Sequence, residues 1–413
     1  MRQSHLFTKT LKESPSDEQA KNAQLLIRAG YIYKNMAGAY SFLPLGLRVV
    51  NNIKNIIREE MNAIGGQEMH MPSLQKSDLW EKTDRWDETN VDVWFKANLR
   101  AGGKVGLAWT HEEPITELMR QYVYSYKDLP IFPYQIQTKF RNEMRAKSGI
   151  MRTREFDMKD LYSFCATQEQ HDKFYESSAE AYMRIFHRLD IGNKTYRTFA
   201  SGGAFTKFSH EFQTLAEAGE DVVYVNEKKG IAVNEEVLNE INLTKEFGIT
   251  KADLEKRKSI EVGNIFSLGT KFSKTLNLNF KNQDGKDQPV IMGSYGIGPA
   301  RLMGTIVDLL SDEKGIVWPK NVAPYAVHLI GIGEDSNKAD ELYKKLRDSS
   351  IEVLYDDRDA RPGQKFADSD LMGMPTRIVV SQKTIDLGGV EVKNRTEESV
   401  KIVTEQELFD MLA

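Results

Sequence analysis

Residues 140–160 read FRNEMRAKSGIMRTREFDMKD, and this segment decides the fold. Arg141 and Glu143 are two residues apart, so on a strand both side chains point to the same face. Residues 144–151 contain two basic side chains and a glycine, which is typical of a flexible cationic loop. The segment predicts two antiparallel strands joined by this loop, with both charged side chains directed at one ligand.

The second half of the segment carries groups that suit a nucleotide. Arg152, Phe156 and Asp160 follow one another at intervals of four, which places them on one face of a strand. Guanidinium groups bind phosphate oxygens, an aromatic ring stacks on a base, and carboxylates accept hydrogen bonds from amino groups. We therefore predict a nucleotide site on an antiparallel sheet, without a glycine-rich phosphate loop.

The bulk composition indicates a globular chain without global basic character. The 413 residues are enough for two or three domains, and 40% hydrophobic and 28% charged residues are ordinary for a soluble protein. The net charge is −4, so an RNA partner requires local basic patches. Cys165 is the one cysteine, which excludes disulfides and cysteine zinc sites. No apolar run approaches ~20 residues and residues 1–18 are polar, so we expect no membrane contact, no secretory signal and a cytoplasmic location.

A helix followed by a short strand is predicted within residues 41–72. Apolar residues recur at three- and four-residue steps at Leu47, Val50, Ile53, Ile57 and Met61. Gly65 and Gly66 end this helix, and a strand follows at 67–71. The other elements predicted before residue 311 are strands at 105–108, 135–143, 154–159, 222–225 and 289–294, two strands within 260–280, a helix from Glu113 to Tyr126, and helices at 168–189 and 299–310.

The chain changes its pattern near residues 315–324. Beyond this boundary strands alternate with helices, which predicts a mixed α/β sheet separate from the antiparallel one. We therefore expect an α+β domain over residues 1–320 and a smaller α/β domain over residues 321–413.

A glycine-rich corner at residues 293–301, GSYGIGPAR, joins a predicted strand to a helix. Its glycines permit close approach of a ligand, and Arg301 falls in the first helical turn, where the positive helix end favours phosphate. A dinucleotide-binding loop is the rival interpretation. We reject it because no βαβ unit with a ribose-binding acid follows.

Together these motifs resemble the class II aminoacyl-tRNA synthetases, whose second signature has the form Arg-x-Glu, loop, Arg/His-x-x-x-Phe. The wider context is similar to the bacterial-type prolyl-tRNA synthetases. The supporting runs occur in that family's order at residues 109–113, 135–143, 151–164, 209–212, 293–301 and 356–373.

This resemblance implies residue roles in amino-acid activation, where the substrate carboxylate attacks ATP and the protein aligns the reactants and offsets charge. Arg141 is implied to bridge the substrate carboxylate and the α-phosphate, and Arg152 to meet the γ-phosphate. Phe156 is implied to stack on adenine, with Glu143 near the adenine and the substrate amine. Arg301 is implied to contact the γ-phosphate and the second adenine face. Arg141 and Arg301 are thus the expected catalytic residues.

The same resemblance implies a proline pocket. Thr110 and Glu112 correspond to the residues that hold the imino nitrogen, and a hydroxyl and a carboxylate suit the two N–H donors of a secondary ammonium. Further candidates for the pocket are Met158, Asp160, Tyr162, His210, Phe212 and Ser294. Met158 and Phe212 are alternatively plain core residues. Glu261 is a candidate Mg²⁺ contact, or else an exposed strand carboxylate.

Two further implications concern macromolecular partners. Residues 356–366 resemble the anticodon-binding domain of this subclass, where Arg358, Arg361 and Lys365 are candidates for contacts with tRNA; a solvated charge run is the alternative. Residues 41–72 look like the first class II motif and imply a homodimer interface. The alternative there is a helix packed only on its own core.

One departure from the family concerns editing. Bacterial-type relatives usually carry a large editing insertion between the second and third motifs. Here residues 226–258, 33 in all, are too few for an independent editing core. We expect no hydrolysis of mischarged Ala-tRNA by this chain, and a separate editing protein to act in trans.

The resemblance thus implies an ATP-dependent proline–tRNA ligase acting on tRNA(Pro). Two alternatives fit less well. A paralogue that only binds RNA has no need to keep Arg141, Glu143, Arg152, Phe156 and Arg301. A synthetase for threonine or glycine fits less well, because residues 110–113 and the whole-chain match favour proline, and one cysteine argues against a zinc-type threonine site.

Overall fold

The computed structural model describes residues 1–201, 208–333 and 336–412. Contacts divide the chain into two compact units: one made of Met1–Met36, Tyr40–Ile53 and Ile306–Ala413, the other of Ala37–Ala39 and Lys54–Thr305. The N-terminal residues thus group with the C-terminal ones, which the sequence pattern did not indicate. The functional boundary near residue 320 stays a prediction.

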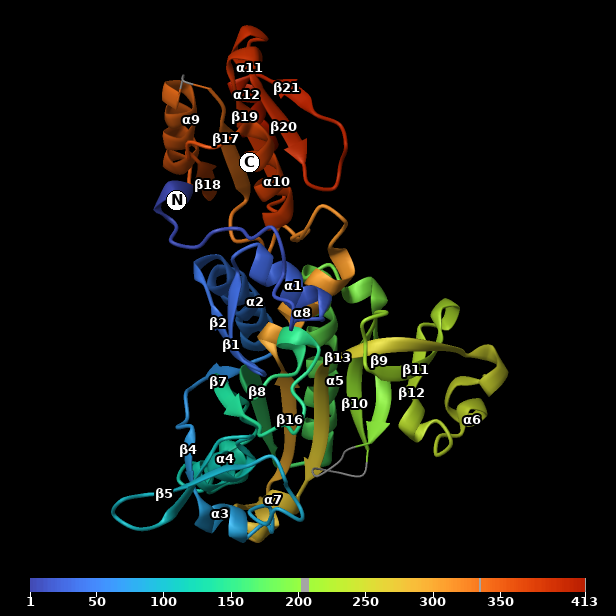
Figure 1. The fold of residues 1–413 in the computed structure, drawn as a ribbon. Helices are drawn as coiled ribbons and strands as arrows, with labels where there is room; N and C mark the ends of the chain where they lie inside the picture. Colours follow the sequence, from blue (N-terminus) through green and yellow to red (C-terminus); the bar gives the residue numbers. More distant parts are fainter. Residues whose placement is uncertain (202–207, 334–335, 413) are drawn as a thin grey trace. The chain divides into compact units, whose positions relative to one another are not determined.

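The larger unit is built on a mainly antiparallel sheet (Figure 1). In the described residues its strand order is β10 (Phe208–Leu215), β9 (Thr195–Ser201), β12 (Ile231–Asn234), β11 (Asp221–Asn226), β13 (Glu255–Gly269), β16 (Ile291–Ile297), β8 (Glu155–Cys165), β7 (Pro133–Phe140) and β3 (Gln67–Glu68). The pairs β9–β12 and β3–β7 are parallel, and the other pairs are antiparallel. The predicted antiparallel fold class is confirmed for this unit.

The hairpin predicted from residues 140–160 is confirmed, with a shift at its ends. β7 and β8 pair antiparallel, with Gln135 opposite Asp160. However, β7 ends at Phe140 and β8 begins at Glu155, so Arg141, Glu143 and Arg152 lie in the connecting segment. Their shared direction therefore comes from the loop. The same-face argument was wrong for these residues, because the loop starts earlier than the alternation indicated.

Residues 226–258 do not form a separate domain. β12 and the short helix α6 (Leu243–Phe247) occur here, and β12 pairs with β11 and β9. Because β10 also pairs with β13, the strands β9 to β13 close into a small ring. Its own apolar cluster consists of Val233, Val237, Leu238, Leu243 and Ile249. Residues 226–258 therefore combine short helices with strands that belong to the main sheet.

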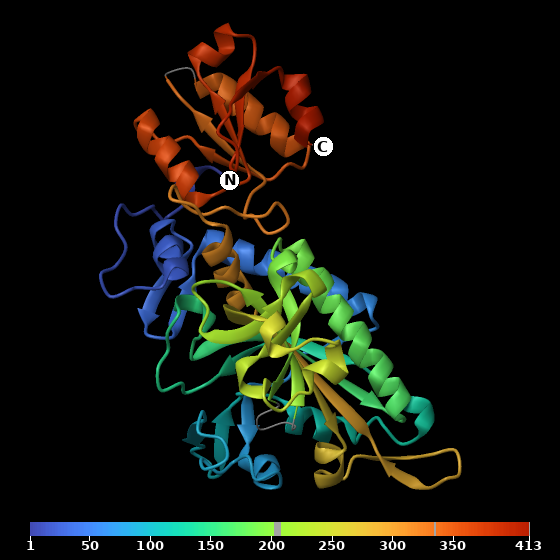
Figure 2. The same ribbon diagram turned by 90° about the vertical axis from the view of Figure 1, so that its right-hand side faces the viewer.

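Helix α5 (Gln168–Arg188), predicted at 168–189, covers one face of the sheet (Figure 2). Its buried Tyr182 and Phe186 pack against Phe212 of β10. Lys159 of β8 also points to this side, since its ammonium donates to the Tyr182 hydroxyl at 2.6 Å. Successive strand residues alternate between faces, so Phe156, Met158 and Asp160 lie on the opposite, open face.

Several short elements border the open face. α3 (Ser77–Glu81), α4 (Glu112–Met119) and a three-stranded sheet of β4 (Leu74–Lys76), β6 (Lys104–Leu107) and β5 (Phe95–Asn98) surround a core of Trp80, Val91, Trp94 and Trp109. α4 ends seven residues before the predicted Tyr126, where Ser125 caps a 3₁₀ turn instead. The predicted pair of strands within 260–280 is interrupted by α7 (Lys271–Thr275).

Two further connections lie in this unit. β14 (Asn279–Lys281) and β15 (Asp287–Pro289) pair as an antiparallel hairpin. The glycine-rich corner joins β16 to α8 (Pro299–Leu310) as expected.

Helix α2 (Pro44–Ala63) forms as its apolar spacing predicts. Val50, Ile53, Ile57 and Met61 are buried, but Leu47 is 47% exposed. Gly65 follows the helix with φ +89°, a conformation that side chains rarely adopt, and the Gly66 N–H bonds to the Met61 carbonyl at 2.9 Å. The strand expected at 67–71 shortens to β3.

The other unit contains the predicted mixed sheet, in the order β18 (Val353–Asp356), β17 (Val327–Gly331), β19 (Thr376–Val380), β20 (Val390–Asn394) and β21 (Lys401–Val403). The first three strands are parallel, and β20 and β21 are antiparallel to their neighbours. Helices α9 (Ser336–Asp348), α10 (Pro362–Met372), α11 (Gln382–Asp386) and α12 (Glu405–Leu412) accompany it. α11 and β21 were not predicted.

The N-terminus belongs to this second sheet. The Met1 ammonium donates to the Val353 carbonyl at 2.9 Å, and the backbone of Arg2 forms an isolated parallel β-bridge with Tyr355 of β18. Also in this unit are α1 (Lys21–Arg28), β1 (Ile32–Met36) and β2 (Ala39–Phe42). Among the helices in the described part of the chain, none has the length and apolar character needed to cross a bilayer.

Candidate active site

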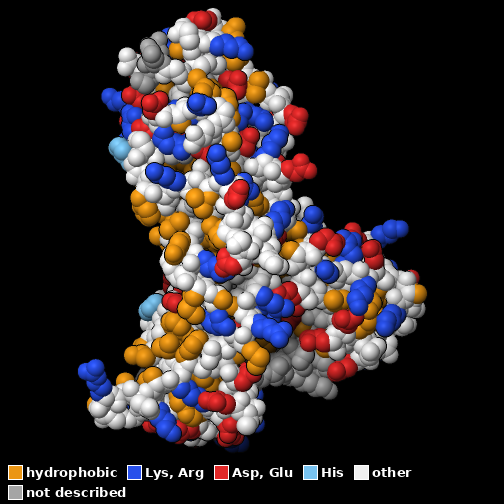
Figure 3. All heavy atoms as spheres, in the orientation of Figure 1, with side chains coloured by type: hydrophobic (Ala, Val, Ile, Leu, Met, Phe, Trp, Pro, Cys, Tyr) orange, Lys and Arg blue, Asp and Glu red, His pale blue; other side chains and the backbone are white. Residues whose placement is uncertain are grey.

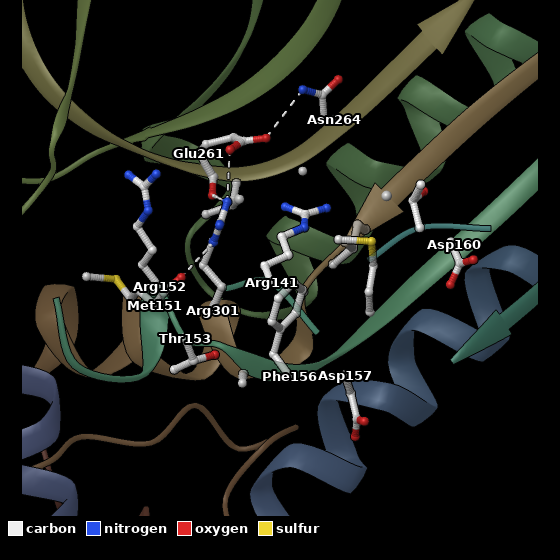
Figure 4. Close-up of a pocket in the computed structure, with 18 of the residues that line it drawn as sticks. Arg141, Met151, Arg152, Thr153, Phe156, Asp157, Asp160, Glu261, Asn264 and Arg301 are labelled. Atoms are coloured by element: carbon white, nitrogen blue, oxygen red, sulfur yellow. Dashed lines mark hydrogen bonds and ion pairs between the residues drawn. The ribbon is translucent and has the colours of Figure 1, made fainter. Parts of the chain in front are cut away.

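A cavity of about 160 Å³ opens on the sheet face away from α5 (Figure 4). It is bordered by the ends of β7 and β8, by β13 and β16, and by the starts of α4 and α8. The sequence-predicted residues that line it are Thr110, Glu112, Arg141, Glu143, Arg152, Phe156, Met158, Asp160, Glu261, Ser294 and Arg301. The structure therefore brings together most of the predicted site.

Arg141 extends its guanidinium into this cavity directly after β7 (Figure 4). The guanidinium carbon lies 5.3 Å from the centroid of the Phe156 ring. Within the described residues, Arg141 forms no ion pair. Burial lowers its pKa, and the nearby Arg301 cation lowers it further. Both effects disfavour its positive charge, so an anionic ligand placed here gains a strong electrostatic partner.

Arg301 enters the same cavity from the first turn of α8. It donates to the Glu261 carboxylate at 2.9 Å and to the Met151 carbonyl at 3.0 Å (Figure 4). Gly296 of β16 also lines the cavity. A Cβ atom added at Gly296 would lie 3.7 Å from its nearest neighbour, the Met158 sulfur, so the space beside this glycine is open. The predicted open approach beside the glycine-rich corner is thus present at Gly296.

The connecting segment of the hairpin carries a small ionic network. Arg152 pairs with Glu143 at 3.2 Å and lies 3.6 Å from Glu220, which precedes β11. Lys147 also pairs with Glu220 at 2.9 Å. The Arg152 and Lys147 side chains are 47% and 54% exposed, so their ion pairs with these carboxylates are weak and a phosphate can replace the carboxylates.

Thr110, Glu112 and Ser294 form a buried polar corner of the cavity. The Glu112 carboxylate accepts from the Thr110 hydroxyl at 2.7 Å on one oxygen and from the Ser294 hydroxyl at 3.1 Å on the other. Glu112 opens α4, where the helix end favours negative charge. A carboxylate held in this way away from water is a strong acceptor for an ammonium group.

Asp160 forms the floor next to this corner. Its carboxylate receives the Lys139 ammonium at 2.7 Å, the Gln135 amide at 2.9 Å and the Tyr162 hydroxyl at 2.9 Å. Burial raises the pKa of Tyr162 well above its usual value, and Asp160 adds to the rise, so the hydroxyl remains a donor. Tyr162 thus contacts Asp160 from behind and does not itself line the cavity.

Three predicted pocket residues lie elsewhere in the described structure, since none of them lines the cavity. Tyr162 is behind Asp160, as described. Phe212 packs on the α5 side of the sheet, which makes it the core residue of the alternative interpretation. His210 accepts from or donates to the Tyr175 hydroxyl at 2.8 Å, and burial lowers its pKa to about 4. Tyr162 shares the face of Asp160 but lies farther along β8, while for His210 and Phe212 the strand period did not indicate which face meets the cavity.

Oxygen donors that suit Mg²⁺ gather at Glu261. Its carboxylate accepts from the Asn264 amide nitrogen at 3.3 Å, while the Asn264 carbonyl oxygen is buried without a hydrogen-bond partner. Glu211 lies beside them, and burial followed by the charge of Glu261 raises its pKa to about 8. Carboxylate and amide oxygens are ligands that Mg²⁺ accepts. Asn264 was missed, because no motif marks an amide on a strand.

Behind Glu112 lies a buried pair that the sequence did not reveal. The Arg85 guanidinium contacts Glu113 at 3.0 Å and Glu112 at 3.4 Å. Burial raises the pKa of Glu113 to about 7, and the Arg85 cation opposes that rise. Two adjacent acidic residues at the start of a helix with apolar residues indicate that a cation lies nearby, but they do not identify the residue that carries it.

The predicted anticodon-binding residues have different environments. Arg358 forms ion pairs with Asp356 at 2.7 Å and with Asp368 at 2.9 Å. Lys365 is buried and donates to the Gly331 carbonyl at 2.8 Å, and burial lowers its pKa. Only Arg361 is exposed, at the start of α10. The structure thus argues against direct RNA contact by Lys365, which anchors α10 to the sheet instead.

Comparison with protein families gives two matches. Residues 95–309 match the model described as tRNA synthetase class II core domain (G, H, P, S and T), and residues 326–413 match the one described as anticodon binding domain.

Named relatives match almost end to end. Proline–tRNA ligase of Caulobacter sp. (strain K31) is 40% identical, covering 96% of this chain and 94% of the relative. Proline–tRNA ligase of Rickettsia africae (strain ESF-5) is 40% identical, covering 95% of both chains. A solved prolyl-tRNA synthetase from Cryptosporidium parvum, complexed with L-proline and AMP, superposes with a TM-score of 0.75 at 18% identity, covering 95% of this chain and 74% of that one. At that identity, the structural match shows the fold alone.

Proposed function

Because this chain belongs to the proline–tRNA ligases of class II, we propose that its cavity joins proline to ATP. The first step yields prolyl-adenylate and pyrophosphate, and the second transfers the prolyl group to the 3′ end of tRNA(Pro). The relatives of known name support this assignment, and they favour proline over the threonine and glycine alternatives. The retained charged residues of the cavity argue against a paralogue that only binds RNA.

A single observation carries the assignment of roles: the Arg141 guanidinium projects into the cavity without an ion pair among the described residues. We propose that it bridges the proline carboxylate and the α-phosphate of ATP. The carboxylate attacks phosphorus, pyrophosphate leaves, and negative charge builds on the phosphate oxygens during this step. A fixed cation at that point stabilises the transition state more than the separated reactants.

The nucleotide is proposed to lie along Phe156 and the two further arginines. Phe156 lines the cavity, so its ring can stack on adenine, and Glu143, which lines the same cavity, is proposed to accept from the base. Arg152 and Arg301 are proposed to hold the γ-phosphate. Both now pair with carboxylates, and the incoming phosphate replaces these partners.

Proline is proposed to bind in the buried corner at Thr110 and Glu112. The ring nitrogen of proline carries two N–H groups, and one carboxylate and one hydroxyl match them in number. Ser294 holds the other oxygen of Glu112, and Met158 and Asp160 form the adjacent wall and floor.

Mg²⁺ is proposed to be held by the Glu261 carboxylate, which lines the cavity and accepts from the Asn264 amide nitrogen. When bound, the ion would supply positive charge beside the phosphates of ATP. Glu261 and Arg301 contact each other at 2.9 Å, so the proposed metal-binding and γ-phosphate-binding groups are neighbours.

Further proposals concern partners and location. We propose that Arg361 contributes to the recognition of the tRNA anticodon region, and that tRNA charging takes place in the cytoplasm. A homodimer through residues 41–72 is proposed with support from exposed apolar side chains. Leu47 on α2 is 47% exposed and Leu74 on β4 is 60% exposed. Figure 3 shows hydrophobic side chains gathered on the surface beside β4 and β7.

Residues 226–258 contribute β12 and the start of β13 to the sheet and form no separate domain, so we propose that this chain lacks an editing domain between its second and third motifs. A pocket shaped for proline discriminates only modestly against alanine, since one methylene is worth about 1–3 kcal/mol. We therefore propose that a separate protein removes alanine from mischarged tRNA(Pro).

The assignment is tested by amino-acid-dependent exchange of pyrophosphate into ATP, run across the twenty amino acids. Exchange with proline, followed by charging of tRNA(Pro), is the expected result. Stronger exchange with any other amino acid, or none at all, contradicts the proposal.

A further inference from the structure

Arg85 occupies an aromatic enclosure behind the cavity. Its side chain is 4% exposed, and the guanidinium carbon lies 4.4 Å from the ring centroid of Trp109, 5.2 Å from that of Phe272 and 5.3 Å from that of Trp80. These rings exclude water from the cation. The charge of Arg85 is therefore poorly screened, and its position strongly affects the electrostatic energy of the buried carboxylates beside it.

Two buried carboxylates compete for this cation. One nitrogen of Arg85 contacts both oxygens of Glu113, at 3.0 and 3.1 Å, and one oxygen of Glu112, at 3.4 Å. The Thr83 hydroxyl donates to Glu113 at 2.8 Å and fixes its orientation. Arg85 is therefore held mainly by Glu113, and its contact with Glu112 is the longer one.

Glu112 uses its oxygens differently. They accept from Thr110 and Ser294 on the cavity side, while Arg85 approaches from behind. Burial raises the pKa of Glu113 to about 7, so above that pH both acids are ionised, two negative charges face one positive charge, and this corner has an excess negative charge. A bound ammonium group in the cavity balances it.

We propose that Glu113 is a positioning residue for substrate binding: by holding Arg85, it keeps Glu112 available to the ammonium group of proline. The inference rests on the proposed function, in which Glu112 receives that ammonium. Without the charge of Glu113, Glu112 is the remaining carboxylate within reach of Arg85 in the described structure. The guanidinium then moves onto Glu112 and competes with the substrate for the same oxygens.

The test uses Glu113→Gln, which preserves size and can still accept from Thr83. Proline affinity is expected to fall at least ~10-fold, with the KM for ATP changed less than ~2-fold. Tetrahydrofuran-2-carboxylate, which has an oxygen in place of the ring N–H groups, serves as the second probe. Its inhibition constant is expected to stay within ~2-fold of the wild-type value, because it makes no ammonium contact with Glu112.

The double variant Glu113→Gln with Arg85→Met removes the competing cation as well. Its proline affinity is expected to return to within ~3-fold of the wild-type value, because no cation then competes for Glu112. Replacing both partners of a buried ion pair by uncharged residues often costs no stability. A purely structural pair predicts the reverse, with the double variant no better than Glu113→Gln. Should the double variant not fold, the comparison of the two ligands on Glu113→Gln decides alone.

Controls separate this inference from the proposed function. Glu117→Gln, on the exposed part of α4 and paired with Arg120, is expected to leave proline affinity unchanged. Glu112→Gln should itself weaken proline binding. If it does not, the proposed role of Glu112 fails, and the inference with it. If Glu112→Gln weakens proline binding but Glu113→Gln does not, or if both ligands weaken equally on Glu113→Gln, the inference alone is overturned.

Discussion

Glu112 and Ser294, which are 182 residues apart in the chain, meet through a hydrogen bond of 3.1 Å. The carboxylate opens α4 and the hydroxyl lies on β16, so the corner forms only when the sheet and the helix are both in place. Ser294 is thus a structural link between the proposed proline pocket and the glycine-rich corner that precedes Arg301.

Ser294→Ala removes one donor to Glu112 and leaves the carboxylate less firmly oriented. We expect the KM for proline to rise about tenfold, equivalent to ~1.4 kcal/mol, while the KM for ATP is unchanged. Steady-state exchange with each substrate varied in turn measures the difference. An equal rise in both constants would mean that the substitution disturbs the whole cavity.

Arg141→Ala is expected to reduce proline-dependent pyrophosphate–ATP exchange by at least ~10³-fold, because a fixed cation at the reacting phosphate is lost. Arg141→Lys should retain part of the activity, since an ammonium keeps the charge but not the planar pair of donors. Arg184→Ala is the matched control, because Arg184 is an exposed arginine of α5 that pairs with Glu60 of α2. Near-normal exchange by Arg141→Ala would remove this residue from its assigned role.

Phe156→Leu keeps the apolar volume but removes the ring. Stacking of a base on an aromatic side chain is worth about 1–3 kcal/mol, so the KM for ATP should rise about tenfold with little change for proline. The same exchange assay gives both constants. A variant with normal ATP affinity would show that the adenine lies elsewhere.

Acid should weaken the unit that contains His328. This histidine is fully buried on β17, and burial lowers its pKa to about 4. Between pH 6.5 and 4 the unfolded chain takes up a proton there and the folded chain does not. The stability contributed above pH 6.5, about 3 kcal/mol, is therefore lost as the pH falls towards 4.

His328→Gln should reduce that loss. Urea unfolding at pH 7.0 and 4.5 is expected to show a pH effect smaller than that of the wild type by about 2–3 kcal/mol. The exposed His5→Gln serves as control. Identical pH effects in His328→Gln and the wild type would exclude this histidine as a source of acid sensitivity.

Purified protein incubated with Ala-tRNA(Pro) is expected to release alanine no faster than the spontaneous rate, because residues 226–258 form no separate domain. Charging with alanine should be detectable under the same conditions, because the pocket rejects the smaller substrate weakly. Deacylation well above the background would reveal an editing activity elsewhere in the chain.

Local patterns predicted much of the architecture. The β7–β8 hairpin, α5, and the β16–α8 corner each follow from periodicity and turn residues close together in the chain. The site was largely predictable too, because its charged residues sit in ordered motifs: Arg141, Glu112 and Arg301 all line one cavity.

What the sequence did not predict depends on contacts across the fold. Phe212 and Met158 both lie on strands of the main sheet, yet only Met158 faces the cavity, because the packing of α5 decides which side is core. Lys365 looked like a surface cation, but its long side chain reaches backbone carbonyls beneath α10. Arg85 belongs to no recognisable pattern, and only the folded arrangement places it against Glu113.

The closed ring of β9 to β13 has one last consequence. Each of β9, β10, β11 and β12 has a bonded neighbour on both sides among the described strands, although β12 and β9 pair only at Ala232 with Thr198 and Val233 with Phe199. A strand from another polypeptide finds only short unpaired stretches there, which guards this lobe against edge-to-edge aggregation. An insertion within residues 226–258 would have to lie in a turn between strands, because an insertion within a strand would interrupt the pairing of the ring.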